Sequence, residues 1–386
     1  SSHETVYQPP YSTTMTGPNK SKENIPVLLD RIIKRIREHK TCEGFTDNQL
    51  YLVIDEAMKL FTPLSALIEI EPPVTIFGDI HGQLNDLLRF ADIVGEPPSV
   101  QWLMLGDYVD RCKKGLEVMM LLLCIKIKYP SRVHLLRGNH ECQKTNRIYG
   151  FYAEMKVKRT TKMWLAFNKL FNEFPLCASI SRKILCMHGG ISQKIIDWKS
   201  LEDLKKPKTI VECDEGIALD LLWADPTNDA CDFRFNQMRY TSVVFGDIAI
   251  KEFTKRLNIS MIVRAHEAVQ EGHNVMSGSR LVTIFSAPNY CGNDGNCASV
   301  MHVSPHFKVN FTTLKPRLDH ANITKEMLEQ LQRYSEVKSP NVQPGRHLAN
   351  SPLPTPKKSD EIMSAKSPIA PRTPHFGTSP SDSNVS

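Results

Sequence analysis

Asp, His and Asn residues recur in this sequence in short motifs, each of which directly follows an apolar run. These side chains are the ligand types of a two-metal hydrolytic centre. The six motifs are 78–82 (GDIHG), 106–111 (GDYVDR), 137–141 (RGNHE), 188–190 (HGG), 264–267 (RAHE) and 286–290 (SAPNY). Because the apolar runs are typical of strands, we expect the motifs to meet at one edge of a sheet and form one site.

The residue types in these motifs predict where two cations would bind. The candidate metal ligands are Asp79, His81, Asp107, Asn139, His188 and His266. The Asp107 carboxylate can bridge the two cations, with Asp79 and His81 on one side and the other three ligands opposite. Imidazole and carboxylate ligands without thiolate favour two divalent metal ions of the Mn, Fe or Zn type over Ca or Mg. Such a pair activates a bridging water and neutralises the charge of a phosphoryl group.

Other polar residues beside the ligands are candidates for catalysis and phosphate binding. His140 is positioned to protonate a leaving alkoxide, and Asp110 can raise its basicity. Arg111 can hold phosphate oxygens with paired hydrogen bonds, which a lysine could not copy. Arg239 has no motif around it, so spacing alone indicates a surface arginine. Tyr290 taken alone is more often a packing residue of the core.

Each motif taken singly has a simpler explanation than function. A Gly-Asp pair or a His-Gly-Gly run is usually a turn, and a lone histidine after a strand, such as His266, is usually a satisfied core residue. The joint occurrence of six motifs at six expected strand ends favours a functional site.

Alternating apolar and amphipathic segments predict the elements that position the motifs. We expect strands at 74–77, 102–105, 133–136, 184–187, 261–263 and 281–285, and a hairpin from 300–303 and 307–311. We expect helices over 27–36, 47–60 (with Thr46 as N-cap), 84–94, 116–127 and most of 151–174. Residues 194–242 read as long loops. Strands alternating with helices imply βαβ units with parallel strands.

Composition narrows the class of protein and its partners. The 386 residues are 41% hydrophobic and 23% charged, as in globular proteins, and no apolar stretch is long enough to cross a membrane. A net charge of +6 without a dense basic run argues against nucleic acid as a partner. Ten cysteines without a Cys-x-x-Cys pair or a secretory signal favour a reducing compartment. We therefore expect the protein in the cytoplasm, with the nucleus as a second location.

The composition also changes along the chain. We expect a disordered arm over 1–24, a catalytic domain over 25–318, and a disordered Pro/Ser-rich tail over 319–386. The tail contains six Ser-Pro or Thr-Pro pairs, which fit either a linker composition or sites for proline-directed kinases. Among them, Thr373 follows an arginine, and we expect its phosphorylation to reduce activity.

The motif series resembles the phosphoprotein phosphatases, the metal-dependent serine/threonine family. The resemblance covers about residues 25–318, and segments 146–152 and 286–292 look closest to the protein phosphatase 1 branch. It implies an α/β (α+β) chain with the calcineurin-like metallophosphoesterase fold, a central β-sandwich of mixed sheets surrounded by helices. This replaces the simple doubly wound sheet that alternation alone suggests.

The resemblance also implies a mechanism and assigns the site. Phosphoserine and phosphothreonine would be hydrolysed by direct attack of a hydroxide that bridges two metals, with His140 as general acid supported by Asp110. The same six metal ligands are implied, and the phosphate-binding residues would be Arg111, Arg239 and Tyr290. Partners would be phosphoprotein substrates and regulatory or targeting subunits.

Several residues depart from the family pattern. Cys112 stands where a glycine is usual, so strain is expected there if that position needs positive φ, and Glu267 stands where glutamine is usual. The groove that docks regulatory Val-x-Phe motifs corresponds to Met261, Val275, Ser279, Val282, Phe307, Lys308, Val309 and Phe311. Ser279 and Lys308 change its character.

Two alternative functions remain on the sequence alone. Cys112 and Glu267 motivate a catalytically impaired scaffold on the same fold that binds partners. The ligand set would also suit a phosphoesterase acting on nucleotides or nucleic acid.

Overall fold

The computed structural model describes residues 23–317. The expectations for residues 1–22 of the arm, for the tail and for its six Ser/Thr-Pro pairs, Thr373 included, concern residues outside this range. They remain predictions.

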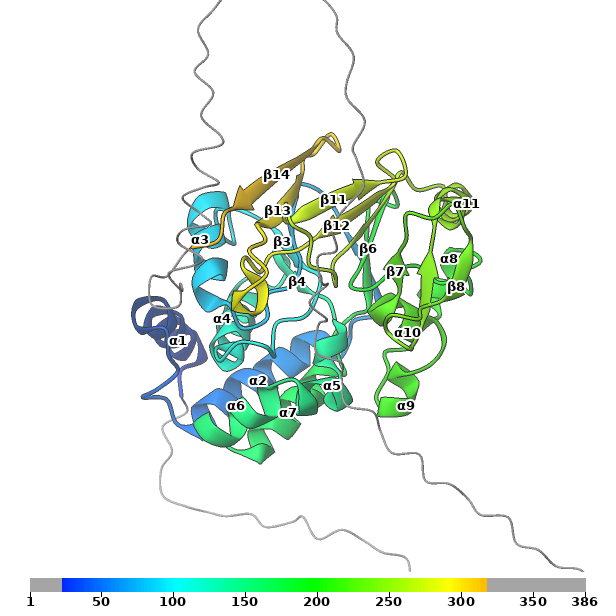
Figure 1. The fold of residues 1–386 in the computed structure, drawn as a ribbon. Coiled ribbons are helices and arrows are strands. Elements are labelled where there is room, and N and C mark those ends of the chain that lie inside the picture. Colours follow the sequence, from blue (N-terminus) through cyan, green and yellow to red (C-terminus); the bar gives the residue numbers. More distant parts are fainter. Residues whose placement is uncertain (1–22, 318–386) are drawn as a thin grey trace, which may run out of the picture. The chain divides into compact units, whose positions relative to one another are not determined.

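A six-stranded mixed sheet forms one half of a sandwich (Figure 1). Its order is β1 (Leu67–Ile70), β5 (Cys177–Ile180), β6 (Ile184–Met187), β10 (Met261–Arg264), β12 (Leu281–Ile284) and β11 (His273–Met276). Strands β6, β10 and β12 are parallel neighbours, whereas β5 pairs antiparallel with β6 and β11 pairs antiparallel with β12.

A five-stranded mixed sheet forms the other half. Its order is β14 (Val309–Leu314), β13 (Ala298–Val303), β2 (Val74–Phe77), β3 (Trp102–Met104) and β4 (Val133–Leu135). Strands β2, β3 and β4 are parallel, as the βαβ pattern predicts, while the β13–β14 hairpin adds antiparallel strands. The sequence places the second hairpin strand at 307–311, but Phe307 takes φ 59° in the turn and the strand starts at Val309.

Apolar side chains from both sheets meet between them. Ile76 of β2, Met301 of β13, Val263 of β10 and Val282 of β12 belong to one buried cluster. The two sheets therefore pack face to face, which confirms the β-sandwich and corrects the doubly wound sheet.

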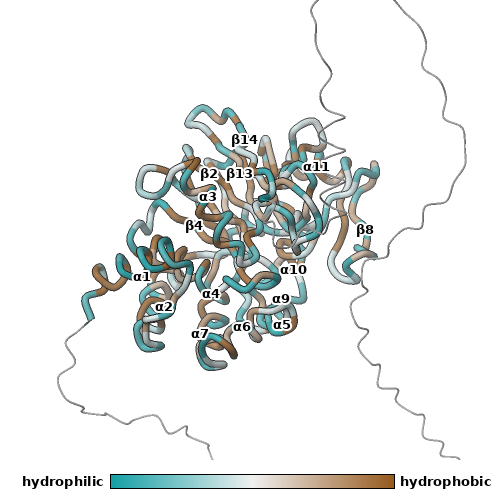
Figure 2. The backbone as a smooth tube through the Cα atoms, turned by 60° about the vertical axis from the view of Figure 1, so that its left-hand side comes forward, coloured by the Kyte–Doolittle hydropathy of each residue, from teal (hydrophilic) through white to brown (hydrophobic). Residues whose placement is uncertain are grey.

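Helices cover the outer faces of both sheets. On the five-stranded side lie α1 (Ile25–His39), α2 (Asp47–Phe61), α3 (Leu84–Val94), α4 (Gly115–Lys128), α5 (Gln143–Ile148), α6 (Phe151–Lys158) and α7 (Thr161–Phe171). On the six-stranded side lie α8 (Trp198–Glu202), α9 (Ile210–Cys213), α10 (Gly216–Trp223) and α11 (Asp247–Leu257). In Figure 2, α1, α2 and α7 alternate brown and teal along their turns, as expected for helices with one buried face.

Local sequence explains where these helices begin. Thr46 caps α2 with a capping box, accepting from the Gln49 amide at 3.3 Å, as predicted. The predicted long helix over 151–174 is divided into α6 and α7 at Thr160, which caps α7. Helix α4 is buried on nearly all sides, because it lies between the sheet and the outer helices.

The region 194–242 contains more regular structure than expected. It holds α8, α9 and α10, together with strands β7 (Asp225–Pro226) and β8 (Phe233–Phe235), which form a small third sheet with β9 (Val243–Phe245) directly after the region. These elements are short, so hydrophobic periodicity has too few residues in which to appear. Helix α11 and strands β1 and β5 were also missed.

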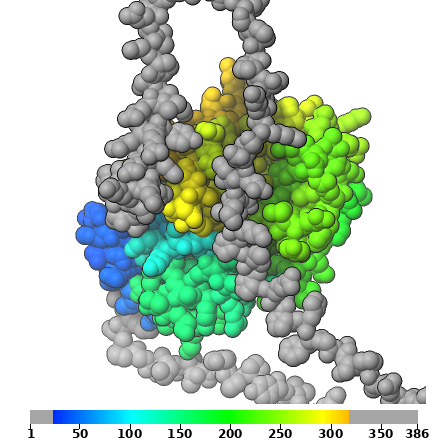
Figure 3. All heavy atoms as spheres, in the orientation of Figure 1, coloured from blue at the N-terminus to red at the C-terminus, as the bar shows by residue number. Residues whose placement is uncertain are grey.

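The carboxyl ends of β2, β3 and β4 in one sheet, and of β6, β10 and β12 in the other, carry the six motifs. An isolated bridge between Asp79 and Phe285 joins the two sheets at this edge. Figure 3 shows the yellow segment after β12 at the surface, between the blue and teal helical layer and the green segment of α8–α11. The motifs therefore share one edge of the sandwich, as the sequence predicts.

Candidate metal centre

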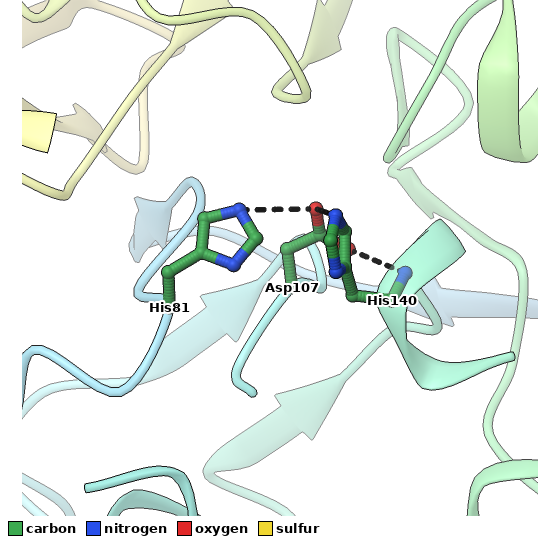
Figure 4. A group of neighbouring side chains, drawn as sticks. All are labelled: His81, Asp107 and His140. Atoms are coloured by element: carbon green, nitrogen blue, oxygen red, sulfur yellow. Dashed lines mark hydrogen bonds and ion pairs between the residues drawn. The ribbon is translucent and has the colours of Figure 1, made fainter. Parts of the chain in front are cut away.

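Asp107 lies at the centre of the clustered motifs. Its Oδ2 atom is 3.4 Å from Nε2 of His81 and 3.4 Å from Nε2 of His188. Two groups able to hold a metal ion share this carboxylate, one containing His81 and His140, the other His188 and His266. Figure 4 shows His81 and His140 on either side of Asp107. This arrangement suits a carboxylate that bridges two cations.

Backbone carbonyls orient the two histidines beside Asp107. His81 Nδ1 lies 2.8 Å from the Val109 carbonyl, and His188 Nδ1 lies 3.1 Å from the Leu105 carbonyl. When each Nδ1–H donates to these oxygens, Nε2 is the nitrogen that is available to a cation beside Asp107. This carbonyl–imidazole pairing is typical of metal-binding histidines.

Acceptor atoms converge on the second side of the centre. The Asn139 Oδ1 atom is 2.8 Å from His188 Nε2, which is itself 3.2 Å from His266 Nδ1. In this orientation the Asn139 side-chain oxygen points into the centre, where it faces only acceptor atoms. An amide oxygen, two imidazole nitrogens and a carboxylate around one point suit a cation, so we prefer this orientation to the reversed one.

Asp79 closes the first side of the centre. Its Oδ2 is 3.6 Å from His81 Nε2, and its Oδ1 accepts the His266 amide at 2.9 Å. The structure therefore brings all six predicted ligands together, and their donor set fits two metals of the Mn, Fe or Zn type.

Electrostatics around the centre favour positive charge. Burial opposes protonation of His81, but the hydrogen bond with Asp79 and the charges of Asp107 and Asp79 outweigh it and raise the His81 pKa to about 9. Burial opposes ionisation of Asp107, yet His188 and His140 hold its pKa far below the usual range. By contrast, burial and then Arg239 lower the pKa of His266, which keeps this candidate ligand neutral.

Several site residues have left-handed backbone conformations, which are costly for residues with a Cβ. Such conformations cluster at functional sites, where the surrounding structure enforces them. Positive φ occurs at His81 (46°), Asp107 (56°), Asp110 (71°), Arg111 (68°) and His266 (69°).

Glu141 has a structural role that motif reading did not assign. Its buried carboxylate accepts from the amides of Asp107 at 2.7 Å, Tyr108 at 2.9 Å and Gly138 at 3.0 Å. It therefore fixes the loop after β3 against the loop after β4. Glu141 is the last residue of the 137–141 motif, and this is the sequence feature that points to its role.

His140 pairs with Asp110, as the sequence suggests. The His140 Nδ1 atom is 2.5 Å from Asp110 Oδ2, and the other Asp110 oxygen accepts the Phe151 amide at 2.7 Å. The His140 Nε2 atom faces the centre, 3.9 Å from Asp107 Oδ2. Asn146 supports the loop by donating to the His140 carbonyl at 3.1 Å.

Arg111 and Tyr290 lie on the His81 side of the centre. The Arg111 guanidinium is 4.5 Å from the Tyr149 ring centre and 6.0 Å from that of Tyr290. The Tyr290 ring is 5.3 Å from the His81 ring, and burial raises the pKa of its phenol, so it stays a hydroxyl donor. Tyr149 was not singled out from the sequence.

Arg239 lies on the His266 side. Its Nη2 donates to the His266 carbonyl at 3.4 Å, and its Nε donates to Asp225 at 2.8 Å. A cavity of about 680 Å³ lined by Asp225, Arg239 and Glu267 opens beside it. Asp225, which sequence reasoning missed, also accepts from Arg264 at 2.7 Å.

The two substitutions inside the motifs are accommodated. At the Cys112 position the condition for strain is not met, because positive φ falls on Asp110 and Arg111 and not on Cys112. The Glu267 carboxylate accepts from the buried Arg264 at 2.7 Å, so its charge is paired.

Comparisons with known proteins agree with this geometry. Residues 72–270 match the model of the calcineurin-like phosphoesterases, and the chain belongs to this family. Two Caenorhabditis elegans chains named as candidate serine/threonine-protein phosphatases are similar to it. One is 45% identical over 79% of this chain and 68% of its own length, and the other 37% identical over 80% and 86%.

A solved structure is also similar. It is described as a protein serine/threonine phosphatase from Saccharomyces cerevisiae with similarity to human phosphatase PP5. It is 29% identical, has a TM-score of 0.68, and aligns with 75% of this chain and 96% of its own. The expected fold, and the expectation of a phosphoric ester hydrolase, are thereby confirmed. Closeness to the protein phosphatase 1 branch stays a prediction.

No helix within residues 23–317 is long and apolar enough to span a bilayer.

Proposed function

We propose that this chain is a protein phosphatase that hydrolyses phosphoserine and phosphothreonine at the edge where the six motifs meet. Support comes from the similar chains named for this activity and from the site. The single observation that carries the proposal is the cluster around Asp107, where two candidate metal groups share one carboxylate beside the paired His140 and Asp110. When bound there, two cations supply an activated water nucleophile and neutralise phosphoryl charge.

The chain's own residues complete the chemistry. Asp110 holds the His140 Nδ1 proton, which leaves Nε2 to carry the proton that the leaving serine or threonine oxygen takes. Arg111 and Arg239 hold phosphate oxygens from opposite sides, and the Tyr290 hydroxyl adds a donor. Because the nucleophile is water, no phosphoenzyme forms.

The test compares leaving groups. Seryl alkoxide is a poor leaving group that needs a proton, whereas a nitrophenolate leaves without one. We expect His140→Ala to lower kcat on a phosphoserine peptide by about 10²–10⁴-fold and on p-nitrophenyl phosphate much less. Equal losses on both substrates would remove His140 as the acid. Absence of any Mn-dependent hydrolysis by the wild type would remove the function itself.

The scaffold alternative makes a different prediction about metal. A scaffold can be metal-free and still bind partners, whereas the phosphatase needs two metals per chain for turnover. Metal analysis of the purified chain, alongside the phosphopeptide assay, separates them. A phosphodiester substrate hydrolysed faster than the phosphopeptide would favour the nucleotide or nucleic-acid alternative.

Regulatory or targeting subunits belong to the same proposal, and so does a cytoplasmic location with the nucleus as a second compartment. Val275 of β11 is 45% exposed, which supports a docking groove at this strand. Val282 is buried and Phe311 stacks on His273 with ring centres 4.0 Å apart, so the groove differs from the expected set. Pull-down with mass spectrometry, comparing wild type with Val275→Asp, tests whether partners bind there.

A further inference from the structure

Cys142 and Cys213 lie against one another although they are far apart in the sequence. Cys142 directly follows the turn of the candidate ligand Asn139, and Cys213 ends α9. The two side chains are free thiols buried in the same apolar cluster, and they hydrogen-bond each other. Figures 1 and 2 both place α9 beside α5, the helix that starts after Cys142.

Polar contacts on both sides of the thiols fix the register of the two segments. On one side, Arg137 Nη1 donates to the Pro207 carbonyl at 2.7 Å. On the other, Lys144 Nζ donates to Asp214 Oδ2 at 2.6 Å. The thiol contact is therefore held by neighbours that do not depend on it.

The surroundings make the Cys213 thiol the more reactive of the two. The hydrogen bond from Cys142 and the charge of Arg137 outweigh burial and lower the Cys213 pKa to about 7. Cys142, which donates that bond and is itself buried, has a raised pKa. Thiolate is the nucleophilic form, and a low-pKa thiol beside a second thiol is the arrangement of redox-sensitive pairs. Cys177 and Cys186 show the contrast, because burial raises the pKa of both.

Cys213 is buried, but it lies in a short element that has exposed neighbours. Helix α9 is a single turn, and Val211 within it is 67% exposed. Local opening of such a turn is inexpensive compared with opening the sandwich. A small oxidant can thus reach the thiol without global unfolding.

We propose that Cys142 and Cys213 form a reversible disulfide when the protein meets a hydroperoxide, and that this lowers the phosphatase activity proposed above. The Cys213 sulfur attacks the peroxide O–O bond, forms a sulfenic acid and releases the alcohol, or water from hydrogen peroxide. The Cys142 sulfur then attacks the Cys213 sulfur. The S–O bond breaks, and the hydroxyl leaves as water with the Cys142 proton. Two thiols lose two electrons and two protons, and the peroxide takes them up.

The disulfide would act on the centre through the loop after β4. A disulfide bond of about 2 Å is shorter than any contact between two thiols, so its formation draws Cys142 and α9 toward one another. The Cys142 amide donates to the Asn139 carbonyl at 3.3 Å, and its thiol is 4.0 Å from the Gly138 carbonyl. The pull on Cys142 therefore acts on the turn that carries Asn139 and His140.

The test oxidises the full, Mn-loaded chain with hydrogen peroxide and, separately, with diamide. Diamide takes two electrons and two protons from two thiols to become a hydrazine. Non-reducing peptide mapping should find a linked peptide containing Cys142 and Cys213. Activity on p-nitrophenyl phosphate should fall by about tenfold or more and return with dithiothreitol.

Matched variants separate this pair from the other thiols. Cys213→Ser should keep the activity of the unoxidised wild type and resist diamide. Cys231→Ser, which removes a half-buried thiol in the loop between β7 and β8, should be inactivated like the wild type. If Cys213→Ser is inactivated as fully as wild type, or the linked peptide is absent from oxidised wild type, the proposal is overturned.

Two further measurements keep the outcome decisive. If Cys213→Ser does not fold, alkylation rates in the wild type at neutral pH replace it, and Cys213 must react faster than Cys177. If the chain has no phosphatase activity, the linked peptide still decides whether the disulfide forms. Failure of the proposed function is thereby distinguished from failure of the thiol pair.

Discussion

Arg239 donates from Nε to Oδ2 of Asp225 at 2.8 Å, so a carboxylate of the small third sheet orients a guanidinium proposed to bind phosphate. Asp225→Asn removes this charge-assisted bond. We expect kcat/KM on a phosphopeptide to fall by about 10–100-fold, mainly through KM, which corresponds to about 1.5–3 kcal/mol. Steady-state kinetics of the variant measure the change.

The control for this prediction is Glu267→Gln. Asp225 and Glu267 both pair with the buried Arg264, but only Asp225 holds Arg239. Glu267→Gln should therefore leave KM close to the wild-type value. A similar rise in KM in both variants would mean that Arg264, not the orientation of Arg239, is responsible.

Gly138 permits a close approach that a larger residue would block. A Cβ at this position would lie 2.2 Å from Asp107 Oδ1 and 2.5 Å from the Asp107 amide. Gly138→Ala should displace the carboxylate and lower the metal content of the purified chain to below one ion per chain. Gly44→Ala is the control, because that Cβ meets nothing within 4 Å and only its φ of 91° is strained. Full metal content in Gly138→Ala, measured by elemental analysis, would contradict the role of Asp107.

The Glu141 carboxylate joins two loops of the centre. Replacing it with glutamine puts an amide donor where three backbone amides need acceptors. We expect Glu141→Gln to lower the free energy of unfolding by about 2–4 kcal/mol and to reduce metal retention. Denaturant unfolding and metal analysis measure the two effects. Glu212→Gln, at the exposed cap of α9, should change the free energy of unfolding by no more than about 1 kcal/mol. If the Glu141→Gln and Glu212→Gln variants were equally stable, the proposed role of Glu141 would be wrong.

The strand ends, the six ligand candidates and the His140–Asp110 pair were readable from sequence because each sits in a motif after a strongly apolar strand. The two-sheet arrangement was not derivable from alternation, since parallel βαβ units occur in both architectures; the family resemblance supplied it. Asp225 contacts Arg239 from 14 residues away, and Tyr149 contacts Arg111 from 38 residues away (149 − 111). The spacing of residues along the chain does not predict such contacts. The short elements between 194 and 242 have too few residues to show a hydrophobic periodicity.

Metal binding should strengthen as pH rises, because protons and cations compete for the same atoms. In the metal-free chain Asp79 and Asp107 raise the His81 pKa to about 9, and the His188 pKa is raised as well, chiefly by Asp107 acting against burial. Below about pH 9 a binding cation must therefore displace at least one proton. Above about pH 9 it has no proton to displace from His81. We expect the Mn association constant to rise by at least about tenfold per pH unit between about pH 7 and about pH 9 and then to level off. Anaerobic calorimetry in two buffers of different ionisation enthalpy measures both the affinity and the protons released. If the affinity were constant over this range and no proton were released, metal binding would not remove the His81 proton, and His81 would not be a ligand.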